Sequence, residues 1–448
     1  MIPFPLKLVP GLINGLFHGD AALLENEITD IVIDSRKVKA GALYVPIVGD
    51  VHDGHNFIQA ARHNGALCVL TEKPLDKEPY ILVDNSVDAL QRLARYYREQ
   101  FSIPVIGITG SVGKTSTKDM IATVLSKHYK VYKTPGNLNN QTGVPQAIFG
   151  LSEDDELAVF EMGTNHPGEI RRLTAMVQPT IAVLTNIGVA HIEFFGTREN
   201  IFRGKAEILE SLRPGGSVIV NGDDDMLIRL HDTIRCGFQS GNDYRAEELR
   251  EEGLAGSFFT VQVEGQPVSM HVPAPGKHMV SNALVAIAVG RSLGLPLNEL
   301  IEGVESFRPA QGRMLIQNTG RYTVIDDSYN ANPNSVMAAI DVLEKTPGRH
   351  VCILGDMLEL GAQSEEFHEV VGMYAALHHM DLIVCVGPNS EQMFMGAIQF
   401  ASRNSRYFET QENMLDILPM LLRDGDTILV KASRGMHLED TVHKLLEL

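Results

Sequence analysis

The chain has 448 residues, and at roughly 150 residues per domain this length predicts about three domains, each able to bury its own core. Its 44% hydrophobic and 21% charged residues are typical of a globular protein and exclude a disordered or collagen-like chain. The formal net charge of -18 argues against nucleic acid or an anionic membrane as a partner, although local donors can still hold small anionic ligands.

Neither an export signal nor a membrane anchor is expected. The first twenty residues lack a basic segment followed by a long apolar core, and no run of about 18 apolar residues occurs. Cys68, Cys236, Cys352 and Cys385 stand alone without Cys-x-x-Cys spacing. This pattern favours buried thiols in a reducing compartment over disulfides or a zinc site, so a cytoplasmic protein is expected.

Residues 1–101 alternate short apolar strands with helical stretches, which predicts a small N-terminal α/β domain. Ser102-Ile103-Pro104 then opens a new segment. The strands expected before this segment are Ile28–Ile33, Ala42–Val48, Ala66–Leu70 and Tyr80–Val83. The expected helices are Asn56–His63 and Val87–Gln100.

Residues 102–312 form the predicted central domain, in which apolar strands alternate with helices as in a mostly parallel sheet. Alternation about Gly265 predicts an antiparallel hairpin over Ser257–Val272 at the sheet edge. A helix is expected near Met279–Leu293, and Phe307–Gly312 is expected to be a linker. The central strands are predicted at Val105–Thr109, Leu157–Phe160, Ile181–Leu184 and Ser217–Val220.

Residues 313–448 show the same alternation and predict a third, Rossmann-like α/β domain. The fold class is therefore α/β, with a small N-terminal domain, a central parallel sheet of the phosphate-loop ATPase kind and this C-terminal domain. Connections near Ser102 and Phe307–Gly312 predict domains that close on bound ligands. The strands expected in the third domain are Tyr322–Ile325, Val351–Leu354, Leu382–Val386 and Thr427–Val430.

The strongest chemical signal is the string GITGSVGKTS at residues 107–116, between a predicted strand and a predicted helix. Glycines let backbone N–H groups close around phosphates, Lys114 can reach the β and γ phosphates, and Thr115 can ligate Mg²⁺. Ile108 stands where the strict template has glycine, so the loop is a variant. A glycine-rich turn with an exposed lysine is the alternative. The residues expected to hold ATP here are Gly110, Ser111, Val112, Gly113, Lys114, Thr115 and Ser116.

Two polar residues follow neighbouring predicted strands, where ligands bind in open parallel sheets. Glu161 follows Leu157–Phe160, and His191 lies shortly after Ile181–Leu184. Together with Thr115 they could supply carboxylate, imidazole and hydroxyl ligands for Mg²⁺. Taken singly, each has an ordinary structural alternative: a hydrogen-bonded histidine, and a glutamate that caps a helix or faces solvent.

Further motifs along essentially the whole chain make the sequence similar to the Mur ligase family. The string Asp326-Asp327-Ser328-Tyr329-Asn330-Ala331-Asn332-Pro333 is typical of the type that adds a dipeptide, and the Asp-Asn-Pro-Arg string of the diaminopimelate-adding type does not occur. The other motifs that carry the resemblance are DSR at 34–36, DGH at 53–55, TPGNLNN at 134–140, GVP at 143–145, EMG at 161–163, KAEI at 205–208, GR at 312–313 and KASRGM at 431–436.

The resemblance implies an ATP-dependent ligase that joins D-alanyl-D-alanine to UDP-N-acetylmuramoyl-tripeptide through an acyl phosphate, in peptidoglycan precursor synthesis. It also implies that Lys114, His191 and Lys205 are catalytic and that Lys205 is carbamylated, so that Thr115, Glu161, His191 and Lys205 ligate Mg²⁺. An isolated lysine on the predicted helix Arg198–Leu212 would otherwise be a solvated surface charge.

Other ligand contacts follow from the same resemblance. Asn282, Arg313 and Asp327 match residues that hold ATP, although alone they could be surface groups. Residues that match substrate contacts could instead make local turns or end a strand. They are Ser35, Arg36, Asn137, Asn139, Asn140, Lys431, Ser433 and Arg434.

Two alternatives stay open at this stage: a ligase of the same family with another amine acceptor, and a nucleotide-dependent switch protein. A monomer is expected. The sequence does not identify the third residue of the acceptor peptide, diaminopimelate or lysine.

Overall fold

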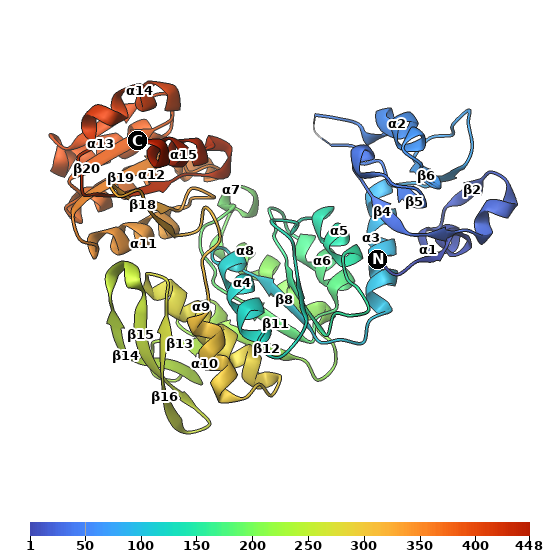
Figure 1. The fold of residues 1–448 in the computed structure, drawn as a ribbon, viewed down its shortest axis with the longest axis horizontal. Helices are drawn as coiled ribbons and strands as arrows, with labels where there is room; N and C mark the ends of the chain where they lie inside the picture. Colours follow the sequence, from blue (N-terminus) through green and yellow to red (C-terminus); the bar gives the residue numbers. More distant parts are fainter. Residues whose placement is uncertain (50) are drawn as a thin grey trace.

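The computed structural model describes residues 1–49 and 51–448, and its three larger sheets form three lobes (Figure 1). The N-terminal lobe and the C-terminal lobe lie at opposite ends of the molecule, with the central lobe between and below them. Within the described ranges, no helix has the length and apolar character needed to span a bilayer. The mixed α/β class predicted from the sequence is confirmed.

The N-terminal lobe has a five-stranded sheet in the order β2-β7-β6-β5-β4. The strand predicted over Ile28–Ile33 is divided, because β3 (Glu27–Ile28) pairs with β1 (Phe4–Pro5) while β4 joins the larger sheet. The strand predicted over Ala42–Val48 ends at Tyr44, shortly before Pro46, which has no N–H to donate. The remaining elements are α1 (Val9–Ile13), β2 (Leu16–His18), β4 (Asp30–Val32), β5 (Ala42–Tyr44), α2 (Ile58–His63), β6 (Cys68–Thr71), β7 (Tyr80–Leu82) and α3 (Ser86–Glu99).

The central lobe contains a nine-stranded sheet in the order β16-β15-β14-β13-β12-β11-β8-β10-β9. The strands from β8 to β14 run parallel, and the edge hairpin of β15 and β16 is antiparallel, both as predicted. Three of these strands were not predicted from the sequence: β9 and β13 are short, and β14 is rich in charged residues. The strands are β8 (Val105–Thr109), β9 (Val131–Lys133), β10 (Leu157–Glu161), β11 (Ile181–Leu184), β12 (Ser217–Asn221), β13 (Ile234–Gly237), β14 (Tyr244–Glu251), β15 (Ser257–Val263) and β16 (Gln266–Val272).

Helices cover both faces of the central sheet, and α9 packs against α4. The helix predicted over Arg198–Leu212 ends at Ala206 and continues as a 3₁₀ turn. At this point the Glu207 carboxylate accepts hydrogen bonds from the N–H groups of Gly168 and Arg171 at 3.0 Å, which ties the turn to the start of α6. The helices are α4 (Lys114–Leu125), α5 (Gly143–Phe149), α6 (Glu169–Val177), α7 (Ile192–Phe195), α8 (Arg198–Ala206), α9 (Lys277–Ser292) and α10 (Leu297–Glu305).

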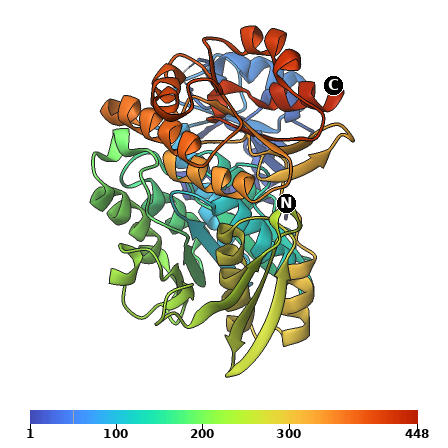
Figure 2. The ribbon, with the colours of Figure 1, turned by 90° about the vertical axis from the view of Figure 1, so that its left-hand side faces the viewer.

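The C-terminal lobe has a six-stranded sheet in the order β17-β18-β22-β19-β20-β21, with only β17 antiparallel. Figure 2 shows this lobe above the central lobe. The two edge strands, β17 and β21, were not predicted. The elements are β17 (Leu315–Asn318), β18 (Thr323–Asp326), α11 (Pro333–Glu344), β19 (Arg349–Gly355), α12 (Ser364–Leu377), β20 (Leu382–Val386), α13 (Ser390–Ala401), β21 (Ser405–Phe408), α14 (Gln411–Leu421), β22 (Asp426–Lys431) and α15 (Glu439–Glu447).

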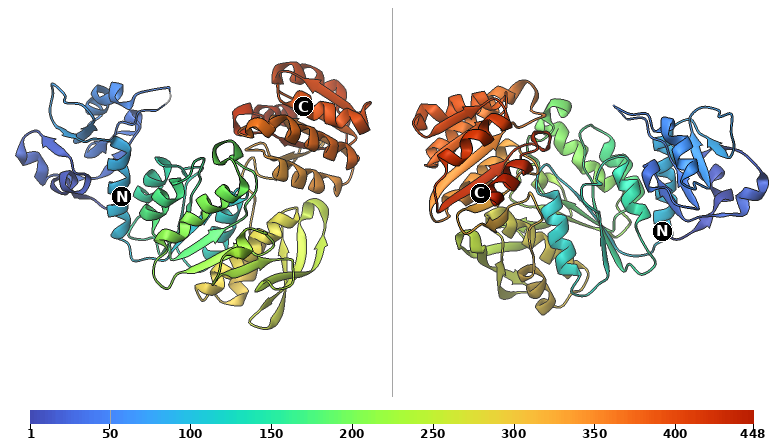
Figure 3. Two further views of the ribbon diagram at one scale, coloured as in Figure 1. Left: turned by 180° about the vertical axis from the view of Figure 1, so that it is seen from behind. Right: turned by 45° about the horizontal axis from the view of Figure 1, so that its top comes forward.

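A single connection without helix or strand joins the central and C-terminal lobes (Figure 3). It runs from the end of α10 at Glu305 to Leu315 and contains the predicted linker. Gly312, with φ of 73°, donates its N–H to Asp326 at 3.0 Å and accepts from the N–H of Tyr329 at 3.1 Å. The end of the linker is therefore anchored to the C-terminal lobe.

Candidate active site

The glycine-rich loop between β8 and α4 forms one wall of the site. Gly110 and Gly113 have φ of 154° and 82°, and a Cβ atom at Gly110 would collide with Thr185 Oγ1. Lys114 donates from Nζ to the carbonyl of Gly110 at 2.8 Å, and burial lowers the pKa of this amine although Glu161 opposes the shift. The loop thus keeps a half-buried amine beside the N-terminal N–H groups of α4, which suits a polyphosphate.

Two residues directly after β11, Thr185 and Asn186, hold this loop and were missed in the sequence. The Thr185 hydroxyl donates to the Val112 carbonyl at 2.6 Å. Asn186 accepts from the Val112 N–H at 2.9 Å through its side chain and from the Ser111 N–H at 3.0 Å through its backbone. Their position at the carboxyl end of a parallel strand was the available signal.

Glu161 stands at the centre of a buried polar cluster. Its carboxylate accepts hydrogen bonds from Thr115 Oγ1 at 2.9 and 3.1 Å and from Asn139 Nδ2 at 2.8 Å. Lys118, also missed in the sequence, places Nζ 3.6 Å from Glu161 and donates to the carbonyl of Thr134. A carboxylate that is 2% exposed needs such compensation, since an isolated buried charge is costly.

His191 and Lys205 lie apart from that cluster. Nδ1 of His191 is 2.6 Å from Oε2 of Glu359 in the C-terminal lobe, and the imidazole holds the pKa of Glu359 below its usual value. Lys205 is 1% exposed, so the surface alternative is wrong; burial, and then Lys114, lower its pKa well below the usual value. Across residues 1–49 and 51–448, no three His, Cys, Asp or Glu side chains gather at one point; the predicted Mg²⁺ set, which includes a threonine and a modified lysine, is not of that kind.

The residues matched to ATP contacts line other parts of the cavity. Asn282 on α9 accepts from Thr117 Oγ1 at 2.9 Å, beside the glycine-rich loop. The guanidinium of Arg313 lies 4.1 Å above the ring of Tyr329. Asp327 accepts from Lys431 Nζ at 2.5 Å, and Lys431 also donates to a neighbouring carbonyl. These side chains belong to the central lobe, the linker and the C-terminal lobe.

Several residues matched to substrate contacts make local bonds instead. Asn140 accepts from the N–H of Gly143 at 2.8 Å and so starts α5, as an Asx turn would. The hydroxyl of Ser433 accepts from the N–H of Leu358 at 2.9 Å. Arg434 pairs with Glu439 at 3.0 Å and stays half exposed.

The remaining matched residues divide between the cavity and the surface. Asn137 lines the cavity. Ser35 is buried on a 3₁₀ turn, and Arg36 pairs with Asp34 at 2.9 Å with its side chain exposed. Both follow β4 by a few residues and lie outside the wall of the cavity.

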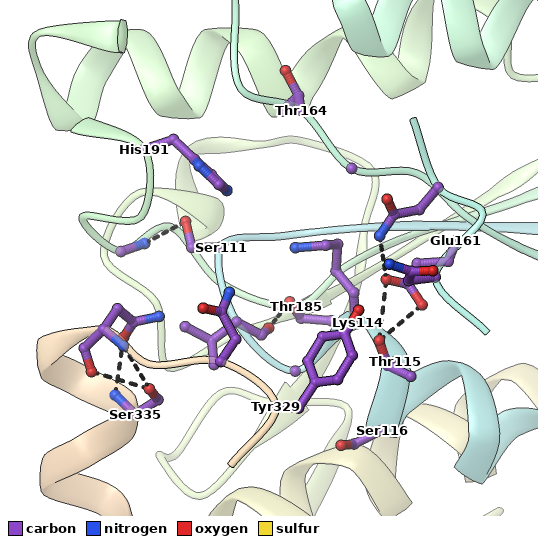
Figure 4. Close-up of a pocket in the computed structure, with 18 of the residues that line it drawn as sticks. Ser111, Lys114, Thr115, Ser116, Glu161, Thr164, Thr185, His191, Tyr329 and Ser335 are labelled. Atoms are coloured by element: carbon purple, nitrogen blue, oxygen red, sulfur yellow. Dashed lines mark hydrogen bonds between the residues drawn. The ribbon is translucent and has the colours of Figure 1, made fainter. Parts of the chain in front are cut away.

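A cavity of about 1090 Å³ brings most of these groups together (Figure 4). All three lobes contribute to its wall, including Ile47 to Gly49 of the N-terminal lobe. Lys114, Thr115 and Glu161 lie on one side of the close-up, His191 and Ser111 on another, and Tyr329 faces the glycine-rich loop. Lining residues that the argument uses are Ser111, Lys114, Thr115, Glu161, His191, Asn282, Arg313, Asp327, Tyr329 and Lys431.

Three family models match successive segments of the chain. The family model described as the Mur ligase middle domain matches residues 108–290. The model described as the Mur ligase, glutamate ligase domain matches residues 312–434, and the one described as the Mur ligase family, catalytic domain matches residues 27–98.

Relatives resemble the chain over its full length. UDP-N-acetylmuramoyl-tripeptide--D-alanyl-D-alanine ligase of Bacillus subtilis is 36% identical over 100% of this chain and 99% of its own, and that of Escherichia coli is 34% identical with the same coverage. A crystal structure of MurF from Acinetobacter baumannii has a TM-score of 0.93 at 33% identity, covering 100% of both chains. The ADP complex of MurF ligase from Thermotoga maritima has a TM-score of 0.84 at 29% identity, covering 96% of this chain and 99% of that one.

The glycine-rich loop, the three lobes around one cavity and these full-length matches lead to one conclusion: the chain belongs to the Mur ligase family, whose members are ATP-dependent ligases.

Proposed function

We propose that the chain joins the amine of D-alanyl-D-alanine to the terminal carboxylate of UDP-N-acetylmuramoyl-tripeptide at the expense of ATP, within the cytoplasmic synthesis of peptidoglycan precursors. The observation that carries this proposal is a single cavity whose wall combines a phosphate loop with residues of two further lobes. Three reactants must meet in this reaction, and the cavity offers one lobe to each. We assign residues 1–101 to the UDP substrate, 102–312 to ATP and 313–448 to the dipeptide.

The reaction needs an activated carboxylate, because a bare carboxylate has no leaving group. Its terminal oxygen attacks the γ-phosphorus of ATP and ADP leaves; the dipeptide amine then attacks the resulting acyl phosphate, loses a proton and expels phosphate. Lys114 supplies positive charge for the transferring phosphoryl group, and the N–H groups at the start of α4 supply preorganised donors. Asn137 and Asn139 offer neutral donors for substrate oxygens.

The nucleotide contacts follow from the walls of the cavity. Asn282 lies beside the loop where the adenine would sit, and Arg313 offers a planar, bidentate donor for phosphate. Asp327 can accept from a ribose hydroxyl, and its bond to Lys431 would have to rearrange for this. Ser35 and Arg36 remain assigned to the UDP group, and Asn140, Ser433 and Arg434 to the substrates, although their present partners are local.

The donor set also fits a magnesium ion. The Thr115 hydroxyl and the Glu161 carboxylate already point at each other at 2.9 Å, and oxygen ligands of this kind suit Mg²⁺. His191 and a carbamylated Lys205 would complete the set. When bound, the ion neutralises charge that develops on the phosphate oxygens.

Carbamylation of Lys205 is supported by the burial of this amine. Carbon dioxide forms a C–N bond only with the neutral amine, which then releases a proton, and the product is an anion. Burial and the neighbouring Lys114 lower the pKa of Lys205, so the neutral form persists to lower pH than for an exposed lysine. As the pH falls through that lowered pKa, the amine becomes protonated and the modification should be lost.

Phosphate release tests the function directly. We expect phosphate release only when ATP, UDP-N-acetylmuramoyl-tripeptide and D-alanyl-D-alanine are all present. We also expect the chain to act as a monomer. Release with another amine in place of the dipeptide would identify a ligase of different acceptor specificity. Release without either organic substrate would instead support a nucleotide switch.

Two variants test the catalytic lysines. Lys114→Ala should stay folded and lose ligation; retention of about a tenth of the rate, a loss of only about 1.4 kcal/mol, would contradict its role. Lys205→Ala should lose most ligation, and a small added carboxylate should restore part of it. Lys127→Ala, at a paired surface lysine, is the control and should keep full activity.

A further inference from the structure

The loop after β19, in the C-terminal lobe, makes a polar contact with the central lobe. Oε2 of Glu359 lies 2.6 Å from Nδ1 of His191, the residue that immediately precedes α7. Both residues have left-handed backbones, with φ of 61° at His191 and 62° at Glu359. Such conformations are uncommon outside glycine and persist where the surrounding structure enforces them. The contact therefore joins two segments whose backbones are already constrained.

The loop that presents Glu359 is anchored inside its own lobe. The N–H of Met357 donates to Nε2 of His368 at 2.9 Å, and His368 is fully buried. The N–H of Leu358 donates to the hydroxyl of Ser433 at 2.9 Å. These bonds flank the glutamate on its N-terminal side, so its carboxylate extends from a rigid base.

A second close approach lies beside the first. Gly361 has φ of 59°, and a Cβ atom built on it would lie 3.2 Å from Cβ of Glu193 in α7. A side chain at this position would press on the helix that begins directly after His191. The two lobes thus meet here with little room, and the geometry of His191 depends on how the C-terminal lobe is docked.

The contact uses only one nitrogen of the imidazole. Because Nδ1 faces Glu359, Nε2 is left for the cavity, and the ring points from its loop toward the amine of Lys114 in Figure 4. The pair meets at 2.6 Å without hydrogen-bond geometry at Nδ1, so in this structure it is a close charge contact. A carboxylate this near favours a proton on the facing nitrogen and thereby orients the ring. This is the arrangement by which a residue outside a site directs one inside it.

We propose that Glu359 is a positioning residue which holds His191 in its working orientation from across the lobe boundary. The phosphate side of the cavity then becomes complete only when the C-terminal lobe, the lobe assigned to the incoming amine, is docked. ATP chemistry is thereby coupled to the presence of the acceptor lobe. This inference rests on the proposed function, because it takes His191 to act during ligation.

Glu359→Ala is the main variant, and Glu251→Ala is its matched control. Glu251 also forms an ion pair across the same two lobes, with Lys345 at 2.6 Å. Its partner Lys345 does not line the cavity, whereas His191, the partner of Glu359, does. We expect Glu359→Ala to lower kcat by about tenfold or more while the KM values for ATP and dipeptide change by less than about threefold. Glu359→Gln, which keeps an acceptor oxygen, should recover part of the loss, and Glu251→Ala should stay within about twofold of the unsubstituted chain.

A double-mutant cycle separates positioning from general docking. In a His191→Ala background, Glu359→Ala should cause no further loss of kcat, because its effect passes through the missing imidazole. Equal losses in both backgrounds would overturn the proposal, as would similar losses for Glu251→Ala and Glu359→Ala.

Nitrogen NMR of the ligand-free chain gives a readout that does not depend on catalysis. The His191 signals, assigned by their loss in His191→Ala, should show protonated Nδ1 and shift on Glu359→Ala but not on Glu251→Ala. If the chain proves inactive with the proposed substrates, this shift still tests the contact. Unchanged His191 signals in Glu359→Ala would refute the positioning role even in an active ligase.

Discussion

The N-terminal lobe meets the central lobe through packed helices, whereas the C-terminal lobe meets it through a linker, side-chain pairs and an apolar contact of α11 with the start of α9. Helix α3 packs against α5 and α6, and the buried Arg98 at its end donates to the carbonyls of Val177 at 3.0 Å and Phe101 at 2.7 Å. At the other junction, Lys345 pairs with Glu251 and Glu359 with His191.

This difference indicates where the molecule can move. Two mobile connections were predicted, near Ser102 and at Phe307–Gly312. The first is held by Arg98 and by Phe101, which is buried, so a change there would break a packed interface. Ion pairs that are partly solvated contribute little, about 0 to 1 kcal/mol each, and can be exchanged during motion. We therefore expect closure to occur at the second junction alone.

The largest effect should come from Arg98→Ala. The substitution leaves two carbonyls without their donor and empties a fully buried volume, so we expect a loss of about 3 kcal/mol in the free energy of unfolding, measured by urea denaturation. Arg95→Ala, on the exposed side of α3 and paired with Glu99, should cost less than about 0.5 kcal/mol. A loss as small for Arg98→Ala would mean that the first junction is not rigid.

A smaller effect is expected for Gly312→Ala in the linker. An alanine would be forced into φ of 73° and its Cβ would lie 3.1 Å from Cβ of Tyr329, for a cost of about 2 kcal/mol. Gly320→Ala shares the left-handed backbone, φ of 83°, but meets nothing within 4 Å, and should cost about 1 kcal/mol. We also expect kcat to fall for Gly312→Ala only. Equal effects of both variants on stability and kcat would contradict a special role of the linker.

Distances between spin labels can locate the motion. One label pair should join the N-terminal and central lobes, and a second pair the central and C-terminal lobes. On adding nucleotide and the UDP substrate, only the second distance should shorten, and small-angle scattering should show compaction. If only the distance within the first label pair changed, or if scattering showed no compaction, the expectation that the second junction closes would be wrong.

The smallest signal concerns thiol reactivity in the two outer lobes. Burial raises the pKa of Cys68 and of Cys352 to about 12, so at pH 8 only about 1 in 10⁴ of each native thiol is ionised. Alkylation, which requires the thiolate, should therefore be very slow and should accelerate as the pH rises. Added urea should expose Cys352 at lower concentration than Cys68, because the C-terminal lobe is less firmly attached. Simultaneous labelling would indicate that both lobes open together.

Local patterns predicted much of the fold and the phosphate loop. Apolar strands in the central sheet are buried on both faces, so their runs stand out from the flanking turns, and glycines at 110 and 113 supply a backbone that other residues resist. The inner strand β14 and the edge strand β17 were missed because they keep exposed or charged residues. The helix break at Ala206 was missed because the bonds of Glu207 to another helix cause it.

The sequence by itself predicted the phosphate loop, since strand, glycine loop, lysine and helix lie within one continuous segment, and the family motifs along the chain then implied a ligase. Only the tertiary structure decided which polar groups form hydrogen bonds within their own lobe, which amines are buried and which side chains meet across lobes. Lys205 and an ordinary surface lysine look alike in sequence, and Glu359 lies 168 positions after its partner His191. Burial and charge pairing depend on distances in space between segments that chain order leaves far apart.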